Sequence, residues 1–271
     1  MLITSIFILV FFLVYLFYLV LYWNWEKTCQ PYYNPHQTLL IGHRGSPTKI
    51  TENTVASFQK ALDQGVDGIE FDVRLSKDKQ IFVFHDQNLK RLSNRPEKVE
   101  SLSLAELQTV ALKKEKGQKE EAHIPSLNEL VPLLAQMKVI NIEIKSNSLF
   151  HGHNILKPLI DFLDKNHLDD KCIISSFNPL ILMKLRLKRP KTIIGFLYRK
   201  SSFFHGWNNL VWMLRVQPEN LHIHHSLLNH WIVRWARKKN IKINSYTINE
   251  KRHYKNIHLD GIFTDNIEYL K

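Results

Sequence analysis

Carboxylate side chains occupy alternate positions in two apolar, strand-like runs of this 271-residue chain. Glu70 and Asp72 alternate with apolar residues in GIEFDV (68–73), and Glu143 lies in VINIEI (139–144). Side chains two residues apart point to the same face of a strand. Three ionised carboxylates do not lie together without a cation, and oxygen-only ligand sets prefer hard divalent ions. The pattern therefore predicts a site for one Mg²⁺ or Ca²⁺ if the fold joins the two runs.

Histidine, arginine and lysine residues lie at or just after the ends of apolar, strand-like runs. TLLIGH (38–43) ends at His43 and is followed by Arg44, a later run ends at His85, and Lys145 follows the run that holds Glu143. Histidine suits general acid and base catalysis near neutral pH. Arginine and lysine predict an anionic substrate, for which phosphate fits best. Alternatively, a lone histidine at a strand end is structural, and an E-x-D strand is a solvated face.

Strand-like runs alternate with segments of helical periodicity beyond residue 37, which predicts a parallel sheet. Nine runs are strand candidates: 38–43, 68–73, 80–85, 139–144, 172–177, 192–197, 221–225, 241–247 and 261–264. The second and third are separated only by RLSKDK, which is too short for a parallel crossover, so they form a hairpin. Eight βα units remain. They predict an α/β fold, a (β/α)8 TIM barrel with its site at the carboxyl ends of the strands.

The hairpin sets the expected position of one histidine. If Asp78 and Lys79 form a two-residue turn, Asp72 lies directly opposite His85. Directly paired side chains have Cβ atoms about 5 Å apart. A longer turn would shift this register. In either case the ends of four separate strands are expected to gather His43, His85 and the carboxylates at one mouth.

The first 25 residues carry no charge, and residues 2–23 are almost continuously apolar. Such a helix would be about 33 Å long, which matches the hydrocarbon core of a bilayer. A cleaved signal peptide is the alternative, but the run is too long and has no basic start. We therefore expect a single-pass transmembrane anchor at 1–25, a linker at 26–37 and the barrel domain at 38–271. The protein is then a membrane protein.

All 37 Lys and Arg residues follow the apolar segment, and the net charge is +12. A basic domain fits nucleic acid or an anionic membrane surface, and the anchor favours membrane lipid. No motif supports nucleic-acid binding. The basic bias favours a cytoplasmic position for the domain by the positive-inside rule. Solvated helix faces account for many of these charges in either case.

The two cysteines, Cys29 and Cys172, are expected to be free thiols.

A series of motifs occurs in order along residues 38–270: GHRG, ENT, DGIEFDV, LSKD, VFHD, RLS, NIEIK, ISSFNP and DGIFTDN. Together they resemble the glycerophosphodiester phosphodiesterase family. The resemblance implies a barrel with a phosphodiesterase site. By motif position it implies that His43 and His85 are the acid and the base. The other roles it implies are metal ligands (Glu70, Asp72 and Glu143) and phosphate-binding residues (Arg44, Lys145 and, in the ENT motif, Glu52).

Tyr246 stands where the family usually has tryptophan, which keeps an aromatic wall and implies a different leaving-group pocket. The short segment after His85 excludes a large inserted cap. Gly45 is expected to let phosphate approach the backbone. His222, His224 and His225 end the sixth barrel strand and are expected to be structural or to line the pocket.

The resemblance implies metal-dependent hydrolysis of a glycerophosphodiester to an alcohol and sn-glycerol 3-phosphate. The family's chemistry suggests that the substrate's glycerol hydroxyl attacks first, giving a cyclic phosphate that water opens; direct attack by water is the alternative. Which histidine is the acid stays open, as do the head group and the oligomeric state.

Two other activities fit the same sequence. Residues 203–216, FFHGWNNLVWMLRV, have apolar residues at helical spacing and form either an interfacial helix or an ordinary packing face. Beside an anchor, an interfacial helix favours a lysophospholipase D that releases lysophosphatidic acid from lysophospholipids, as some family members with membrane segments do. A non-catalytic binder of anionic lipid is a further alternative, but it gives the three carboxylates no purpose.

Overall fold

The computed structural model describes residues 2–115, 118, 121–198, 203–254 and 257–270, except for the side chains of residues 2, 3 and 203–208. Among these residues, one sheet contains nine strands. Their bounds are β1 (Leu39–His43), β2 (Gly68–Leu75), β3 (Ile81–Val83), β4 (Val139–Ile144), β5 (Cys172–Ser176), β6 (Ile193–Tyr198), β7 (Asn220–His224), β8 (Lys242–Tyr246) and β9 (Gly261–Thr264).

Eight of these strands form a closed parallel barrel. β1 pairs in parallel with β2 on one side and with β9 on the other, and the strands between them pair in parallel around the ring. β3 pairs with β2 and is antiparallel to it. The prediction of a TIM barrel with one hairpin outside the ring is therefore confirmed.

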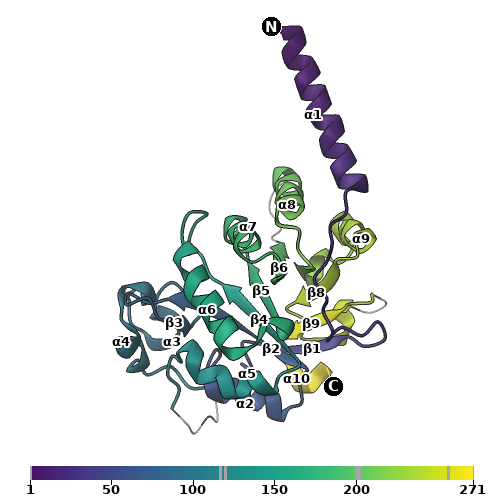
Figure 1. Ribbon diagram of the computed structural model, residues 1–271. Helices are drawn as coiled ribbons and strands as arrows, with labels where there is room; N and C mark the ends of the chain where they lie inside the picture. The colour runs from purple at the N-terminus through teal and green to yellow at the C-terminus, as the bar shows by residue number, and fades with distance from the viewer. Residues whose placement is uncertain (1, 116–117, 119–120, 199–202, 255–256, 271) are drawn as a thin grey trace.

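Helices cover the outside of the barrel (Figure 1). They are α2 (Val55–Asp63), α5 (Val131–Gln136), α6 (Leu156–Asn166), α7 (Pro179–Lys188), α8 (Phe203–Val216), α9 (Trp231–Lys238) and α10 (Ile267–Leu270). The hairpin excursion carries α3 (Lys90–Ser93) and α4 (Leu104–Gln108), which pack over a small apolar core of their own. Short 3₁₀ turns lie at Val99–Ser101, Leu127–Leu130, His153–Ile155, Asp169–Lys171, His225–Leu227 and Lys251–Tyr254.

Two of the sequence motifs begin helices at the mouth. Thr54 of the ENT motif is the N-cap of α2, and its hydroxyl accepts a hydrogen bond from the backbone N–H of Ser57. Asn178 of the SFNP motif is the N-cap of α7, with Pro179 at the first helical position. These residue types satisfy amide groups that a helix start leaves unpaired. The motifs therefore serve the barrel's framework as well as its site.

The register expected for the hairpin is wrong by one residue. β2 and β3 pair Val73 with Val83, so Asp72 lies across from Phe84, whose N–H donates to the Asp72 carbonyl. The pairing extends to Ser76, whose N–H donates to the Gln80 carbonyl, so three residues and not two connect the paired positions, and Lys79 has a φ of +64°. A type I turn followed by a left-handed residue is a common three-residue hairpin connection. His85 therefore lies one position beyond the residue that pairs with Asp72.

The barrel interior changes from apolar at one end to charged at the other. At the amino ends of the strands, inward-facing Leu39, Val139, Ile173, Ile193 and Phe263 pack together with Tyr32. At the carboxyl ends, the inward positions hold the acidic and histidine side chains. The alternation along each strand directs the other residues into the main core beneath the helices. The apolar layers thus form a packed floor under a polar mouth.

His222 occupies the middle of this interior. It is fully buried, and its ring centroid lies 4.9 Å from that of Phe263. Gly195 on the neighbouring strand makes the space, because a Cβ there would lie 2.5 Å from Cε1 of His222. Burial lowers the pKa of His222 to about 3. The expectation of a structural role fits this position, whereas His224 is exposed at the end of β7.

The buried ring predicts acid sensitivity. The unfolded chain binds a proton at His222 near the ordinary pKa of about 6.5, and the folded chain does not, so stability falls as the pH drops below that value. We expect the His222→Leu variant to lose less stability on acidification than the parent, by up to about 1.4 kcal/mol per pH unit between about pH 6.5 and pH 3. Urea unfolding near neutrality and near pH 5 measures the difference. Equal pH dependence in the two proteins would contradict this.

The segment predicted as a linker closes the floor of the barrel. Tyr32 is buried, and the hydroxyl of Tyr33 lies 2.8 Å from Oδ1 of Asn220 and 2.9 Å from Oδ1 of Asn244. These asparagines lie at the amino ends of β7 and in β8. Figure 1 shows the segment passing along the β8 and β9 side of the barrel before β1 begins. Residues 26–37 therefore hold the foot of α1 near the barrel.

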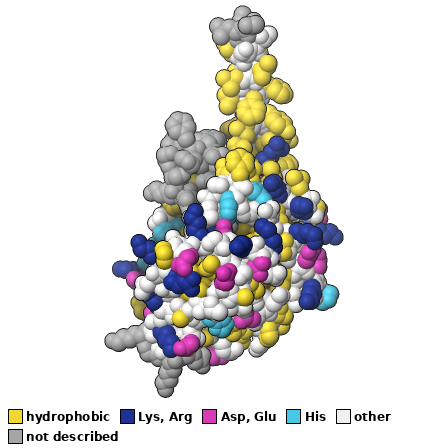
Figure 2. Space-filling view, turned by 90° about the vertical axis from the view of Figure 1, so that its left-hand side faces the viewer, with side chains coloured by type: hydrophobic (Ala, Val, Ile, Leu, Met, Phe, Trp, Pro, Cys, Tyr) yellow, Lys and Arg dark blue, Asp and Glu magenta, His cyan; other side chains and the backbone are white. Residues whose placement is uncertain are grey.

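The amino-terminal helix α1 (Leu2–Tyr22) projects away from the barrel (Figure 1). Its stretch from Thr4 to Tyr22 is long and apolar enough to cross a membrane, by length and composition, and none of its most apolar part is buried in the protein. A signal sequence near an amino terminus meets the same criteria. Figure 2 shows this helix covered with hydrophobic side chains, in contrast to the mixed charged surface of the barrel.

Candidate active site

The strand register brings the predicted acidic residues together at the carboxyl ends of β1, β2 and β4. His43 pairs with Glu70 between β1 and β2, and Asp72 pairs with Glu143 between β2 and β4. Each of the three carboxylates offers one oxygen within 4.8 Å of the oxygens of the other two. All three side chains are buried. Because paired positions in a sheet share a face, strand pairing alone creates this cluster.

The three carboxylates fit a hard divalent cation. Their donor set contains only oxygen, which Mg²⁺ and Ca²⁺ prefer. Oε1 of Glu70 is buried and has no hydrogen-bond partner among the described residues. A buried acceptor without a partner is costly, and a bound cation would satisfy it. The residues that would hold the ion are therefore Glu70, Asp72 and Glu143.

The carboxylates differ in their tendency to ionise. Burial, together with the negative charge of Asp72, raises the pKa of Glu70 well above its ordinary value. Burial would also raise the pKa of Asp72, but the positive charges of Lys145 and Arg44 hold it well below its ordinary value. Nζ of Lys145 lies 3.0 Å from Oδ1 of Asp72 and 2.6 Å from Oε1 of Glu143. Glu70 is thus the carboxyl whose charge has the least compensation from its neighbours.

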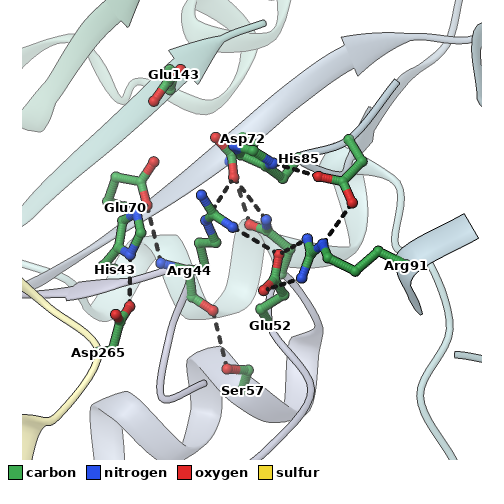
Figure 3. Close-up of polar contacts among 12 residues, drawn as sticks. His43, Arg44, Glu52, Ser57, Glu70, Asp72, His85, Arg91, Glu143 and Asp265 are labelled. Carbon is green, nitrogen blue, oxygen red and sulfur yellow. Dashed lines mark hydrogen bonds and ion pairs between the residues drawn. The ribbon is translucent and has the colours of Figure 1, made fainter. Parts of the chain in front are cut away.

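His43 is held by a carboxylate on its far side. Its Nδ1 lies 2.7 Å from Oδ1 of Asp265, and its Nε2 lies 3.9 Å from Oε2 of Glu70 (Figure 3). Asn249 fixes Asp265 by donating to Oδ2 and by accepting from the Asp265 backbone N–H. Burial alone would lower the pKa of His43, but the charge of Glu70 and the hydrogen bond to Asp265 raise it. Asp265 therefore orients the ring and favours its protonated form.

His85 has the same kind of support. Its Nδ1 lies 2.6 Å from Oδ1 of Asp86. Arg91 donates to Oδ2 of Asp86 and to both carboxylate oxygens of Glu52, and Glu52 in turn accepts from Arg44. Figure 3 shows this chain of contacts across the mouth. Glu52, predicted among the phosphate-binding residues, lies between two arginines and holds them in place.

The loop after β1 places Arg44 against the acidic cluster. Arg44 has a φ of +57°, and its backbone N–H donates to Oε2 of Glu70. Its Nε lies 3.3 Å from Oδ2 of Asp72, which also accepts from Nδ2 of Asn53. The approach of phosphate to the backbone at Gly45 stays a prediction, and packing gives this glycine a second reason. Gly45 has a φ of +90°, and a Cβ there would lie 2.4 Å from Oγ of Ser57. The glycine therefore lets α2 pack closely against this loop.

A cavity of about 510 Å³ opens beside the cluster. His85, Glu143 and Lys145 lie on its catalytic side. Its other wall includes Phe177, whose ring centroid lies 6.3 Å from that of Tyr246. The Tyr246 hydroxyl donates to the carbonyl of Tyr198, so its ring is fixed at the mouth. Tyr246 therefore lies beside an aromatic residue of the cavity wall, in line with the aromatic wall that the family resemblance implied.

The structure brings together eight of the nine residues that the sequence suggested, and the ninth, Tyr246, lies beside Phe177 of the cavity wall. Sequence reasoning gave no role to four side chains that support them: Asn53, Asp86, Arg91 and Asp265. Each lies inside or next to a motif, since Asp86 follows His85 and Asp265 belongs to DGIFTDN. The signal was therefore present, but Asp265 and Arg91 also bond partners that lie far from them in the sequence. Asp265, for example, is 222 positions from His43.

Comparison with known proteins agrees with this geometry. Residues 43–269 match the model of the "Glycerophosphoryl diester phosphodiesterase family". A glycerophosphodiester phosphodiesterase of Caldanaerobacter subterraneus subsp. tengcongensis is 31% identical over 239 residues, which cover 86% of this chain and 96% of the relative. A lysophospholipase D of Rattus norvegicus is 26% identical over 281 residues, covering 85% and 84%.

A solved structure of a phosphodiesterase is also similar to this chain over most of its length. An Oleispira antarctica phosphodiesterase in complex with the product sn-glycerol-3-phosphate has a TM-score of 0.73 and 26% identity, and the match covers 85% of this chain and 94% of that one. The matched region holds both histidines and all three carboxylates. The chain is an enzyme that belongs to the glycerophosphoryl diester phosphodiesterase family.

Proposed function

We propose that the protein hydrolyses glycerophosphodiesters to an alcohol and sn-glycerol 3-phosphate, using a divalent cation and two histidines. The observation that carries the proposal is the meeting of His43, His85 and three carboxylates at one barrel mouth. The product in the Oleispira antarctica structure supports the substrate class. Asp265 and Asp86 hold the Nδ1 atoms of the two rings, which leaves each Nε2 free to carry a proton at the mouth.

The two histidines have different surroundings, which supports a division of roles. The raised pKa of His43 favours the imidazolium, the form that donates a proton to a departing alkoxide. His85 lines the cavity beside Phe177 and would accept the proton of the attacking hydroxyl. The attacking group is the substrate's own glycerol hydroxyl or a water molecule.

Charge neutralisation at phosphorus is the second part of the proposal. Arg44 and Lys145 present their cationic groups to the mouth from two different strand ends. Glu52 holds the Arg44 guanidinium, so less orientational freedom is lost when phosphate binds. A Mg²⁺ or Ca²⁺ ion bound by the three carboxylates would supply Lewis-acid stabilisation of phosphoryl oxygens.

Asp265 provides a test of histidine positioning. In the Asp265→Asn variant, we expect kcat to fall by about 10- to 100-fold, because His43 loses a charged partner that favours its cationic form. The pH profile of kcat should also move to lower pH on its alkaline limb, since the pKa of His43 falls. Stopped assays across the pH range measure both effects. An unchanged profile with unchanged kcat would show that Asp265 is only structural.

The substrate class can be tested with the purified full chain. We expect release of sn-glycerol 3-phosphate from glycerophosphocholine, glycerophosphoethanolamine or glycerophosphoinositol, measured by a coupled dehydrogenase assay. Inorganic phosphate should not appear, because the site cleaves one ester of a diester. If none of these compounds is cleaved with either metal, the proposal fails for soluble diesters.

A lysophospholipase D activity is the second candidate. The similarity to a rat lysophospholipase D and the exposed apolar helix α1 favour it. Lysophosphatidylcholine and glycerophosphocholine share a head group and differ in the acyl chain, so they form a matched pair of substrates. Cleavage of the acylated compound alone, with release of choline and lysophosphatidic acid, would replace the first candidate by the second.

We also propose that residues 1–25 anchor the enzyme in a membrane, with the barrel domain of residues 38–271 on the cytoplasmic side. The unburied apolar face of α1 and the absence of Lys and Arg before residue 27 support this. Liposome flotation tests the anchor, and protease protection in intact cells tests the side. A protein that stays soluble, or that loses its first residues on maturation, would contradict the anchor.

A further inference from the structure

The foot of α1 is bonded to the barrel helix α9. Nε1 of Trp235 donates to the carbonyl of Val20 over 2.7 Å. Nζ of Lys239 donates to the carbonyls of Leu21 and Trp23 over 2.9 and 2.8 Å. Lys239 is only 3% exposed. A lysine at the carboxyl end of a helix satisfies free carbonyls and complements the helix dipole. These contacts fix α1 relative to the barrel.

A groove of about 720 Å³ lies between α1 and the second half of α8. Its walls are mostly apolar and aromatic, and Arg215 is the one charged residue among the described residues that line it. The residues that line it are Phe12, Tyr15, Leu16, Tyr18, Leu19 and Trp23 from α1, and Val211, Leu214 and Arg215 from α8. Leu16, Leu19 and Trp23 also pack against the main core. Because the foot of α1 is held in place, the groove is a fixed feature of the structure.

The chemistry of the groove suits a phospholipid. If α1 lies in a bilayer, the apolar walls contact acyl chains, and Tyr15, Tyr18 and Trp23 resemble the aromatic residues of a membrane interface. Arg215 is exposed, and its side chain forms no hydrogen bond or ion pair with the described residues. An arginine that lines an otherwise apolar groove is complementary to a lipid phosphate. Figure 2 shows further Lys and Arg side chains near the foot of the helix.

We propose that this groove binds one anionic phospholipid, with an acyl chain between α1 and α8 and its phosphate on Arg215. The proposal rests on the anchor proposed above. The lipid is not the substrate in a catalytic position. Helices of this barrel return toward the amino ends of the strands, so the last turn of α8, which holds Arg215, lies at the floor and not at the catalytic mouth. The lipid instead sets how the barrel is seated on the membrane.

Native mass spectrometry of the detergent-purified full chain tests this site. We expect one bound phosphatidylglycerol molecule per chain, retained better than phosphatidylcholine. Arg215→Gln should weaken retention of phosphatidylglycerol about fivefold. Val211→Trp, which fills the groove, should reduce retention of both lipids. Arg234→Gln is the matched control, because it removes an exposed arginine of α9 that does not line the groove.

The outcomes separate this inference from the anchor. The site is supported if both groove variants lose the lipid, melt at the temperature of the parent and still float with liposomes. It is overturned if the parent floats but retains no lipid, or if both variants retain phosphatidylglycerol as the parent does. If the parent does not float with liposomes, the anchor itself fails and the lipid site fails with it.

Discussion

The His43→Ala variant is expected to lose about two to four orders of magnitude in kcat toward glycerophosphodiesters. The ring lies at the end of β1, held on one side by Asp265 and facing Glu70 on the other. The proposed mechanism needs a proton donor at that point. We expect no neighbouring group to take over this role when the imidazole is removed. Initial rates at saturating substrate measure the effect on kcat directly.

The control for this prediction is another histidine. His36 is exposed and lies before β1, so His36→Ala should keep near-parental kcat. The melting temperature of His43→Ala should remain close to that of the parent, because the imidazole is removed from a polar mouth and not from the apolar floor. A His43→Ala enzyme that keeps more than about a tenth of parental kcat would contradict the acid and base assignment.

The Glu70→Gln variant is expected to show the second large effect: lower metal affinity and activity, but a higher melting temperature without metal. Removing the charge deletes one ligand of the proposed metal site, so metal affinity and activity should fall by at least about 100-fold. In metal-free buffer the same variant should melt at a higher temperature, since a buried carboxyl next to Asp72 is replaced by a neutral amide. The amide oxygen can still accept from the Arg44 backbone N–H. Calorimetric titration and thermal melts in EDTA measure the two effects.

Glu219 offers a matched contrast. It is as buried as Glu70, but its carboxylate contacts Arg186 over 2.7 Å and accepts from the Ile194 N–H. Glu219→Gln should therefore destabilise the fold by about 3 kcal/mol and leave metal affinity unchanged. Equal stability changes in the two variants, or parental metal affinity in Glu70→Gln, would argue against a metal site at the mouth.

Much of this fold follows from local patterns. The alternation of Glu70 and Asp72 with apolar residues fixes which face of β2 turns inward, and the parallel pairing of β2 with β4 then places Glu143 beside Asp72. Short connections exclude a crossover between β2 and β3. These are short-range constraints on a closed sheet, which is why strand order and the acidic cluster could be predicted.

Other features depend on contacts that the sequence pattern does not encode. The hairpin register depends on whether Lys79 adopts a left-handed conformation, which is uncommon for lysine. A glycine is needed at position 45 because Ser57 of the following helix packs against it and leaves no room for a Cβ. Asp265 and Arg91 act through hydrogen bonds to partners far along the chain. Tyr33 closes the barrel floor although its segment resembles a linker.

The central claim is that this mouth hydrolyses glycerophosphodiesters with the help of a cation held by Glu70, Asp72 and Glu143. The most direct measurement is turnover of glycerophosphocholine by the EDTA-treated full chain, before and after addition of Mg²⁺ or Ca²⁺. We expect almost no release of sn-glycerol 3-phosphate in EDTA, recovery with at least one of the two ions, and no recovery in Glu70→Gln. Full activity in EDTA, or recovery in Glu70→Gln equal to that of the parent, would contradict the claim.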